Sequence, residues 1–316
     1  MKIIGTGSTL PAKTVTNDML ASFLDTSDEW ITERTGIKTR RLITTETLID
    51  MGADAAKKAI DMSGIDVADI DYLICSNVAN NFVTPAMSCI VEGMIGADCP
   101  CFDLNGACAG FLFALDMADG LLKTGRANNI LIVCAEEPSK FCNWEMRDTT
   151  ILFGDGAGAV VVTRGDEHVL SVKMSTKSKY ESLYYQRKME LTPFDQGTEL
   201  YNPLVMDGRD VFRMAVSSSI RDLDYVMNEA KIDPAEVTYY LLHQANLRII
   251  DSIRKHLGQP QEKFPTNLER FGNTSSASIP ILMDEMIRDG RIKRGDLLLL
   301  SAFGAGFVSG AIAMRY

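Results

Sequence analysis

The sequence predicts an α/β protein made of two related halves, with two similar sheets and helices between and outside them. Two observations predict this class. Segments of the first half recur in the same order in the second, and apolar runs of strand length alternate with segments of helical length. Such alternation is typical of layered α/β proteins. We expect one half over residues 1–165 and the other over 166–316.

Three pairs of segments carry the internal similarity. Each pair combines a turn with an apolar run, and the pairs are 65–74 with 232–241, 125–133 with 290–300, and 153–162 with 303–314. Recurrent strand–turn–helix patterns could give one such match by chance, but three in the same order favour a duplication. The two members of the last pair lie closer together in the sequence than the members of the other pairs, because the first half carries an extra stretch around 136–150.

The expected strands are short, nearly continuous apolar runs, as in strands that are buried on both faces. They span 72–78, 130–135, 157–163, 239–242 and 297–302. The expected helices span 48–62, 108–123, 211–230, 245–257 and 275–289. Segment 182–204 has two prolines and no clear period, so we expect a long loop there.

Composition excludes several classes of protein. The 316 residues are 46% hydrophobic and 23% charged, which are ordinary globular values that argue against disorder and collagen-like repeats. No apolar run approaches the ~18 residues that a bilayer span needs. The N-terminus has no apolar region of signal-peptide length, so we expect a soluble, cytoplasmic protein without a membrane partner.

Charge and cysteine usage narrow the partners further. The net charge of −10 argues against nucleic acid, which is bound through a basic surface. The seven cysteines include no Cys-x-x-Cys pair and have no histidine near them, so we expect no metal site. Unpaired thiols within apolar stretches suit a reducing compartment.

Cys108 is a candidate nucleophile. It stands between an expected strand, 101–104, and a helix that is apolar nearly all round and therefore expected to be buried. In the first turn of a helix, unpaired N–H groups and the positive end of the dipole favour a thiolate. Its neighbours within 106–110 are glycine and alanine, which leave room for a substrate. An inert buried cysteine is an equally good interpretation of these residues alone.

His243 and Asn273 are weaker candidates when each is taken alone. His243 closes the apolar strand 239–242, and the C-terminal ends of strands are where α/β folds carry their chemistry. Asn273 lies in a turn before a helix. A satisfied core histidine and a turn or capping asparagine are the simpler interpretations of the single residues.

Four segments together resemble the beta-ketoacyl-acyl carrier protein synthase III family. They are 106–111 around Cys108, 243–250 from His243, 272–278 around Asn273, and 302–307. Residues 26–37 add to the likeness, which extends from residue 3 to residue 315. The resemblance implies the duplicated thiolase-like fold, with five layers in the order α-β-α-β-α.

The resemblance also implies a two-stage reaction. The Cys108 thiolate takes an acyl group from acyl-CoA and forms an acyl-enzyme. Malonyl-acyl carrier protein then loses CO₂, and the resulting enolate attacks the acyl thioester to give a 3-oxoacyl-acyl carrier protein in fatty acid initiation. His243, as an N–H donor, and the Asn273 amide would stabilise the charge on the malonyl thioester oxygen. Both partners are substrates, so no cofactor is expected.

A backbone oxyanion hole is implied at Cys108 and Ala305. The family usually has three glycines in this loop, whereas this chain has Gly304-Ala305-Gly306. If position 305 requires a positive φ, alanine would be strained there. The departure bears on the geometry of the hole, while Ala305 still supplies an N–H group.

The resemblance implies a CoA-binding role for five residues. The sequence alone would class them as ordinary surface residues. Trp30 and Arg147 would hold the adenine between them, and Arg34 would lie near the phosphates. Gly208 and Asn246 would line the pantetheine tunnel. Stacking combined with positive charge suits an adenine nucleotide physically.

Basic side chains are candidates for docking an acidic carrier protein on this acidic chain. They are Arg213, Arg248, Arg254 and Lys255. A solvated helix face explains them equally well.

Thr84 stands where well-known short-chain members carry a phenylalanine that closes the acyl pocket from the partner subunit. This placement presumes the homodimer that family members form. A small residue would enlarge the pocket, and each further buried methylene is worth ~0.8 kcal/mol. We therefore expect acyl primers longer or bulkier than acetyl.

Other functions fit the residues less well. A dinucleotide loop at Gly5 and Gly7 lacks a third glycine and a following helix. A cysteine hydrolase could use the same three side chains, but it leaves the duplication unexplained. A non-catalytic carrier-protein-binding module would not need all three. The serious alternative is a related condensing enzyme or acyltransferase of secondary metabolism with another acceptor.

Overall fold

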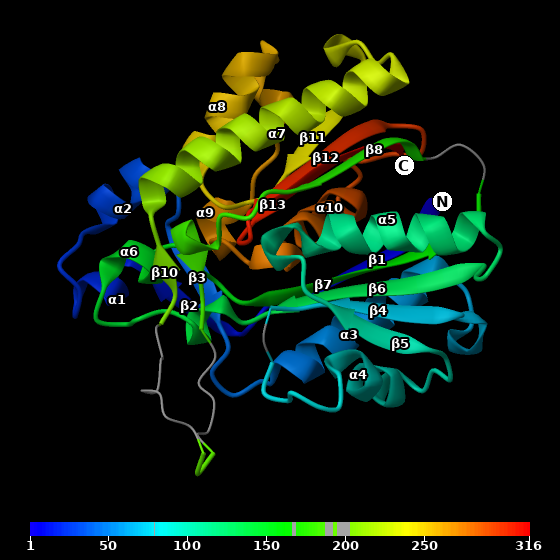
Figure 1. The fold of residues 1–316 in the computed structure, drawn as a ribbon, viewed down its shortest axis with the longest axis horizontal. Helices are drawn as coiled ribbons and strands as arrows, with labels where there is room; N and C mark the ends of the chain where they lie inside the picture. Colours follow the sequence, from blue (N-terminus) through cyan, green and yellow to red (C-terminus); the bar gives the residue numbers. More distant parts are fainter. Residues whose placement is uncertain (79, 166–168, 187–191, 195–202) are drawn as a thin grey trace.

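The computed structural model describes residues 1–78, 80–165, 169–186, 192–194 and 203–316. Two sheets lie face to face with helices between them and helices on both outer sides (Figure 1). The predicted α-β-α-β-α layering is therefore confirmed.

The two sheets have corresponding strand orders. The first sheet runs β1 (Lys2–Thr9), β7 (Gly156–Thr163), β6 (Asn129–Glu136), β4 (Tyr72–Ser76) and β5 (Cys101–Leu104). The second runs β8 (Val169–Thr176), β13 (Val308–Arg315), β12 (Leu297–Gly304) and β11 (Tyr239–Leu242). In both sheets the first strand is antiparallel to the second, and the second is antiparallel to the third. The third and fourth strands are parallel to each other. The matching order supports the duplication, and the boundary at 165 stays a prediction.

Three apolar cores separate the layers. The central core contains α5 (Gly110–Lys123) and α10 (Ser278–Arg288), which lie between the sheets. The outer faces are covered by α3 (Leu48–Ser63) and α4 (Met87–Ile95) on the first sheet, and by α7 (Gly208–Ala230) and α8 (Leu247–Leu257) on the second. A sheet that is covered on both faces explains why its strands read as continuous apolar runs.

Short elements surround one end of these layers. They are β2 (Lys13–Thr16), α1 (Asn17–Ala21), α2 (Asp28–Thr35), β3 (Thr39–Leu42), α6 (Arg147–Thr150), β9 (Leu183–Tyr184), β10 (Val205–Met206) and α9 (Leu268–Phe271). The predicted long loop 182–204 falls largely outside the described residues, and its described part includes β9, which pairs with β10.

The predicted helices at 108–123 and 275–289 begin later than their apolar patterns suggest. Each is preceded by a 3₁₀ turn, Ala107–Ala109 before α5 and Ser275–Ala277 before α10. The first residues of these turns, Ala107 and Ser275, have φ angles of 46° and 53°. Non-glycine residues adopt that region only at a cost, and such strain concentrates at functional sites.

Two further features concern the helices and the cysteines. Within the described ranges, no helix combines the length and apolarity that a membrane crossing requires. All seven cysteines are free thiols.

Strand β1 packs unusually closely on α3. A Cβ atom on Gly5 would lie 2.1 Å from the backbone oxygen of Ala59. We expect Gly5→Ala to lower the free energy of unfolding by about 1–3 kcal/mol, because helix and sheet must move apart. The measurement is urea unfolding followed by circular dichroism. Gly93→Ala is the matched control, since a Cβ there meets no atom within 4 Å in α4. Equal effects of the two changes would contradict this packing argument.

Candidate active site

Cys108 lies where two pockets meet. It is half-buried and lies in the 3₁₀ turn before α5, whereas the sequence predicted it in the first turn of the helix itself. One cavity of about 530 Å³, here called the Trp30 pocket, contains Cys108, His243 and Asn273 in its lining together with Trp30. The other, of about 450 Å³, is here called the Tyr184 pocket, and apolar and aromatic residues dominate its lining around Cys108. The three predicted residues therefore share one cavity, with a second cavity behind the sulfur.

The protonation state of Cys108 differs from the prediction. Burial raises the pKa of its thiol to about 12, with a smaller opposing contribution from its hydrogen bond with Ser275. The argument from the helix N-terminus did not include this desolvation, which disfavours the thiolate. Cys108 is therefore a neutral thiol at rest and needs a proton acceptor before it can attack.

His243 follows β11, and its side chain is almost fully buried. Its Nδ1 lies 2.7 Å from Oγ of Ser278, while Nε2 has no hydrogen-bond partner among the described residues. Burial lowers the pKa of the imidazole to about 3, so the ring is neutral at physiological pH. One ring nitrogen is thus fixed in the protein, and the other is left for a ligand in the Trp30 pocket.

Asn273 is held by the first half of the chain. Its backbone N–H donates to Leu152 (2.8 Å), and its backbone oxygen accepts from Gly154 (3.1 Å). Its side-chain Oδ1 accepts from the backbone N–H of Ser275 at 2.8 Å. Because Oδ1 is engaged, the side chain is oriented with Nδ2 as the group able to donate to a ligand.

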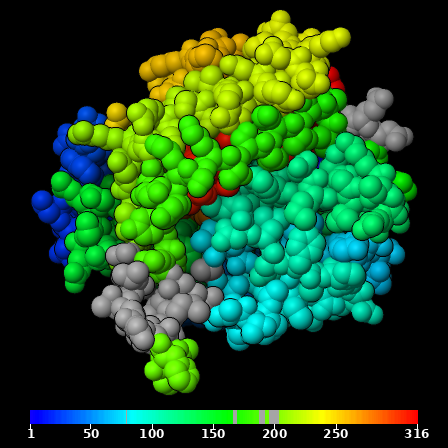
Figure 2. Space-filling model, viewed as in Figure 1, coloured from blue at the N-terminus to red at the C-terminus, as the bar shows by residue number. Residues whose placement is uncertain are grey.

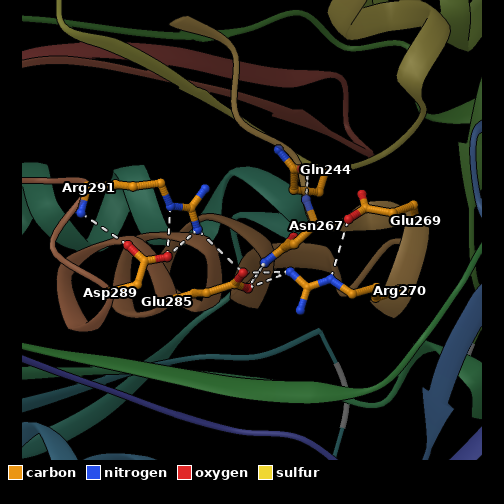
Figure 3. A network of polar contacts seen from close by, with 7 residues as sticks. All are labelled: Gln244, Asn267, Glu269, Arg270, Glu285, Asp289 and Arg291. Atoms are coloured by element: carbon orange, nitrogen blue, oxygen red, sulfur yellow. Dashed lines mark hydrogen bonds and ion pairs between the residues drawn. The ribbon is translucent and has the colours of Figure 1, made fainter. Parts of the chain in front are cut away.

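A polar network anchors the segments that carry His243 and Asn273 (Figure 3). Gln244 donates from Nε2 to the Leu242 oxygen (2.7 Å) and accepts at Oε1 from the Asn267 backbone (3.1 Å). Arg270, on α9, donates to both carboxylate oxygens of Glu285 on α10 at 2.6 and 2.8 Å. The turn after β11, α9 and α10 are thereby tied together around the site.

The loop at the end of β12 closes on Cys108. A Cβ on Gly304 would lie 2.6 Å from the Cys108 backbone nitrogen, so only glycine permits this approach. Ala305 does not have a positive φ, whereas Gly306 has a φ of 132°. Alanine is therefore unstrained at 305, and the departure from three glycines does not disturb the loop.

The residues predicted for CoA lie in the lining of the Trp30 pocket, except Arg147, which contacts the Trp30 ring. Guanidinium carbons of Arg34 and Arg147 lie 4.8 and 4.5 Å from the Trp30 ring centroid. Gly208 and Asn246 line the same pocket. An aromatic ring held between Trp30 and Arg147 needs about 7 Å, twice a ~3.5 Å contact distance, so Arg147 has to move aside for an adenine.

The four basic residues predicted for docking fall into two groups. Arg248 lines the Trp30 pocket and lies 5.8 Å from the Phe212 ring, while Arg213 pairs with Asp210 on the same helix. Arg254 and Lys255 both pair with Asp251 at 2.6 Å, which reduces their net charge. Arg209, which was not predicted from the sequence, also lines this pocket.

Thr84 lies in an exposed segment, beside Phe82 and Val83, which are 47% and 73% exposed. It lines neither the Trp30 pocket nor the Tyr184 pocket in the single chain. Any role of Thr84 in the acyl pocket therefore requires a second copy of the chain.

Three site residues were not predicted from the sequence. Ser278 contacts His243, Ser275 contacts Cys108, and Glu136 contacts Ser275. A carboxylate at the end of the apolar run 130–135 was the available signal for Glu136. The serines had no such signal, because serine before a helix is common.

Burial of His243 makes its neutral state testable. We expect its ring resonances to stay unchanged between about pH 5 and pH 8, because the buried site offers no counter-charge for an imidazolium. The measurement is ¹⁵N NMR of labelled protein, with the resonance assigned by its loss in His243→Asn. Titration of that resonance near pH 6.5, the ordinary pKa of histidine, would contradict a neutral, buried His243 ring.

Comparisons with known proteins show which family this chain resembles. Residues 102–178 match the family described as 3-Oxoacyl-(acyl-carrier-protein) synthase III, and 227–316 match its C-terminal family. The beta-ketoacyl-(acyl-carrier-protein) synthase III of Aquifex aeolicus is 40% identical over 318 residues, covering 100% of this chain and 99% of the relative.

Solved structures give the same result. The crystal structure of 3-oxoacyl-(acyl-carrier-protein) synthase III from Aquifex aeolicus has a TM-score of 0.93 at 41% identity, covering 100% of this chain and 99% of that one. The priming beta-ketosynthase of the R1128 polyketide pathway has a TM-score of 0.93 at 34% identity, covering 99% and 95%. The chain belongs to the beta-ketoacyl-acyl carrier protein synthase III family.

Proposed function

We propose that this acyltransferase moves an acyl group from acyl-CoA to Cys108 and then condenses it with malonyl-acyl carrier protein. The observation that carries the proposal is the shared cavity of Cys108, His243 and Asn273, which Trp30 also lines. The product is a 3-oxoacyl-acyl carrier protein, and CoA and CO₂ are released. The reaction initiates fatty acid synthesis, needs no cofactor, and takes place in the cytoplasm, where seven free thiols remain reduced.

His243 and Asn273 serve the decarboxylation. Loss of CO₂ places negative charge on the malonyl thioester oxygen, which the two side chains stabilise as N–H donors. For His243 this requires the Nε2–H tautomer, with the Ser278 hydroxyl donating to Nδ1. The Gln244 backbone N–H donates to Oγ of Ser278 at 3.4 Å. Because that oxygen already accepts this hydrogen bond, its own proton is favoured to point toward Nδ1 of His243.

Backbone N–H groups of Cys108 and Ala305 form the oxyanion hole for acyl transfer. Both residues line the Tyr184 pocket, where the acyl chain lies. Developing charge on the acyl thioester oxygen is stabilised by such fixed donors. The unstrained backbone at Ala305 supports this role.

CoA and the carrier protein use the mouth of the Trp30 pocket. Adenine stacks between Trp30 and Arg147 after Arg147 leaves the ring, and Arg34 binds phosphate. The pantetheine arm passes Gly208 and Asn246 toward Cys108. Arg248, which lines the Trp30 pocket, docks the acidic carrier protein, and Arg213, Arg254 and Lys255 contribute more weakly because Asp210 and Asp251 neutralise them.

A homodimer completes the acyl pocket. Strand β5 is at the edge of its sheet, and the exposed Phe82 and Val83 offer apolar surface beside Thr84. Burial of this segment against a second copy brings Thr84 to the partner's Tyr184 pocket. A threonine there leaves room for primers beyond acetyl.

The nucleophile assignment is tested by intact-protein mass spectrometry after incubation with acyl-CoAs. We expect wild type to gain one acyl group and Cys108→Ala to gain none, because the acyl-enzyme cannot form. His243→Ala and Asn273→Ala should be acylated but decarboxylate malonyl-acyl carrier protein about 10²–10³-fold more slowly, because each loses a donor to the oxyanion. Full condensation by the Asn273 variant would contradict its role.

The acyl pocket is tested with a chain-length series of acyl-CoAs. We expect wild type to accept primers beyond acetyl, and Thr84→Phe to lose about fourfold in kcat/KM per added methylene, since each buried methylene is worth ~0.8 kcal/mol. Thr84→Ser, which keeps the small volume, is the control and should retain the wild-type profile. Strict acetyl preference in wild type would end this proposal.

A further inference from the structure

A carboxylate lies buried behind the nucleophile. Glu136 is the last residue of β6, and none of its surface is exposed to solvent. An ionised carboxylate is costly to bury unless hydrogen bonds compensate it. Its partners all lie next to the active site, so its position calls for an explanation beyond packing.

Glu136 is joined to Cys108 through one hydroxyl group. Its Oε1 accepts from Oγ of Ser276 at 2.6 Å and faces Oγ of Ser275 at 3.1 Å, while Oε2 accepts from the Val78 backbone at 3.1 Å. The same Oγ of Ser275 lies 3.4 Å from Sγ of Cys108. The Cys108 thiol, the Ser275 hydroxyl and the Glu136 carboxylate thus form a continuous chain of contacts. Cys108 and Glu136 belong to the first half, and Ser275, which joins them, belongs to the second.

The direction of these hydrogen bonds depends on the charge of Glu136. Ser275 has one hydroxyl proton, which an ionised Glu136 draws toward itself. The Ser275 oxygen then has a lone pair free to accept from the Cys108 thiol. In this arrangement a proton leaving the sulfur has a continuous path to the carboxylate.

The pKa values in the site favour Glu136 rather than His243 as the acceptor of the Cys108 proton. Burial raises the pKa of Glu136 to about 7, which suits a proton acceptor at neutral pH, whereas the pKa of His243 is lowered to about 3. The titratable groups that face Glu136, within the described part of the chain, are the thiols of Cys108 and Cys134. Burial and the Glu136 charge raise the pKa of the Cys134 thiol well above its usual range.

We propose that Glu136 accepts the Cys108 proton through Ser275 when the enzyme is acylated, and returns it by the same route after condensation. The proposal rests on the proposed function of Cys108 as nucleophile. Glu136 and Ser275 act through the sulfur, and they position and move its proton.

The proton balance closes over the two stages. In acylation the thiol proton passes to Ser275 as the Ser275 proton passes to Glu136, the sulfur bonds to the acyl carbon, and CoA leaves with the electron pair of the broken C–S bond. Solvent protonates the CoA thiolate at the pocket mouth. In condensation the enolate carbon bonds to the acyl carbon and Cys108 leaves as a thiolate, which recovers the proton held by Glu136.

A purely electrostatic role of Glu136 makes the opposite prediction. Its negative charge raises the pKa of Cys108, so loss of the charge alone would make the thiol more acidic and more reactive. A relay instead makes Glu136→Gln less reactive, because the amide cannot take the proton. The sign of the change therefore separates the two roles.

The experiment measures the rate of Cys108 alkylation by iodoacetamide from about pH 5.5 to pH 10, read from the Cys108 peptide by mass spectrometry. We expect the wild-type rate to rise through about pH 7, where Glu136 ionises, and then to level off. Glu136→Gln and Ser275→Ala should each react about 10²-fold more slowly at pH 7.5 and keep rising to pH 10. The double variant should be no slower than either, because the two residues serve one path.

Asp155→Asn is the matched control, since Asp155 is a second buried carboxylate with a raised pKa but binds Ile43 and Ser139 instead. Its alkylation profile should equal that of wild type. If Glu136→Gln does not fold by near-ultraviolet circular dichroism, Ser275→Ala decides. Equal or faster alkylation, or uniform slowing without a changed pH profile, in a folded variant overturns the relay. Acylation of wild type by acyl-CoA, measured in parallel, shows separately whether the proposed function holds.

Discussion

The active site depends on the close contact between the turn that carries Cys108 and the end of β12. No side chain fits at Gly304, where a Cβ would lie 2.6 Å from the Cys108 nitrogen. A backbone bridge between Phe153 and Asn273 makes a second link between the halves. Figure 2 shows red atoms of the C-terminal segment between green atoms above them and teal atoms of the first half below. The packing of one half on the other therefore places the nucleophile and the amide.

Burial at this contact decides the protonation states. Desolvation is the first cause of the raised pKa values of Cys108 and Glu136 and of the lowered pKa of His243. All three shifts favour the neutral form, which is the cheaper form to bury. A neutral thiol is a poor nucleophile, so a site of this kind gains reactivity only when a proton can leave the sulfur.

The fold was predictable because buried strands leave continuous apolar runs, and 239–242 was placed to the residue. Cys108, His243 and Asn273 were ambiguous one by one, and only their combination identified the family. The sequence argument for an acidic Cys108 considered only the local helix end, whereas the desolvation that raises the pKa of the thiol comes from packing. Ser275 and Ser278 were missed since their partners lie far away in the sequence.

The duplication explains how such distant residues meet. The 3₁₀ turns before α5 and α10 occupy corresponding places in the two halves, and both begin with a residue of positive φ. In the turn before α5, Ala107 has the positive φ and is followed by the nucleophile Cys108. In the turn before α10, the residue of positive φ is Ser275, which contacts the Cys108 sulfur. Because both turns border the central core, the related halves bring together two different chemical groups. Strain at Ala107 and Ser275 is thus a cost that the fold bears where its two halves supply the site.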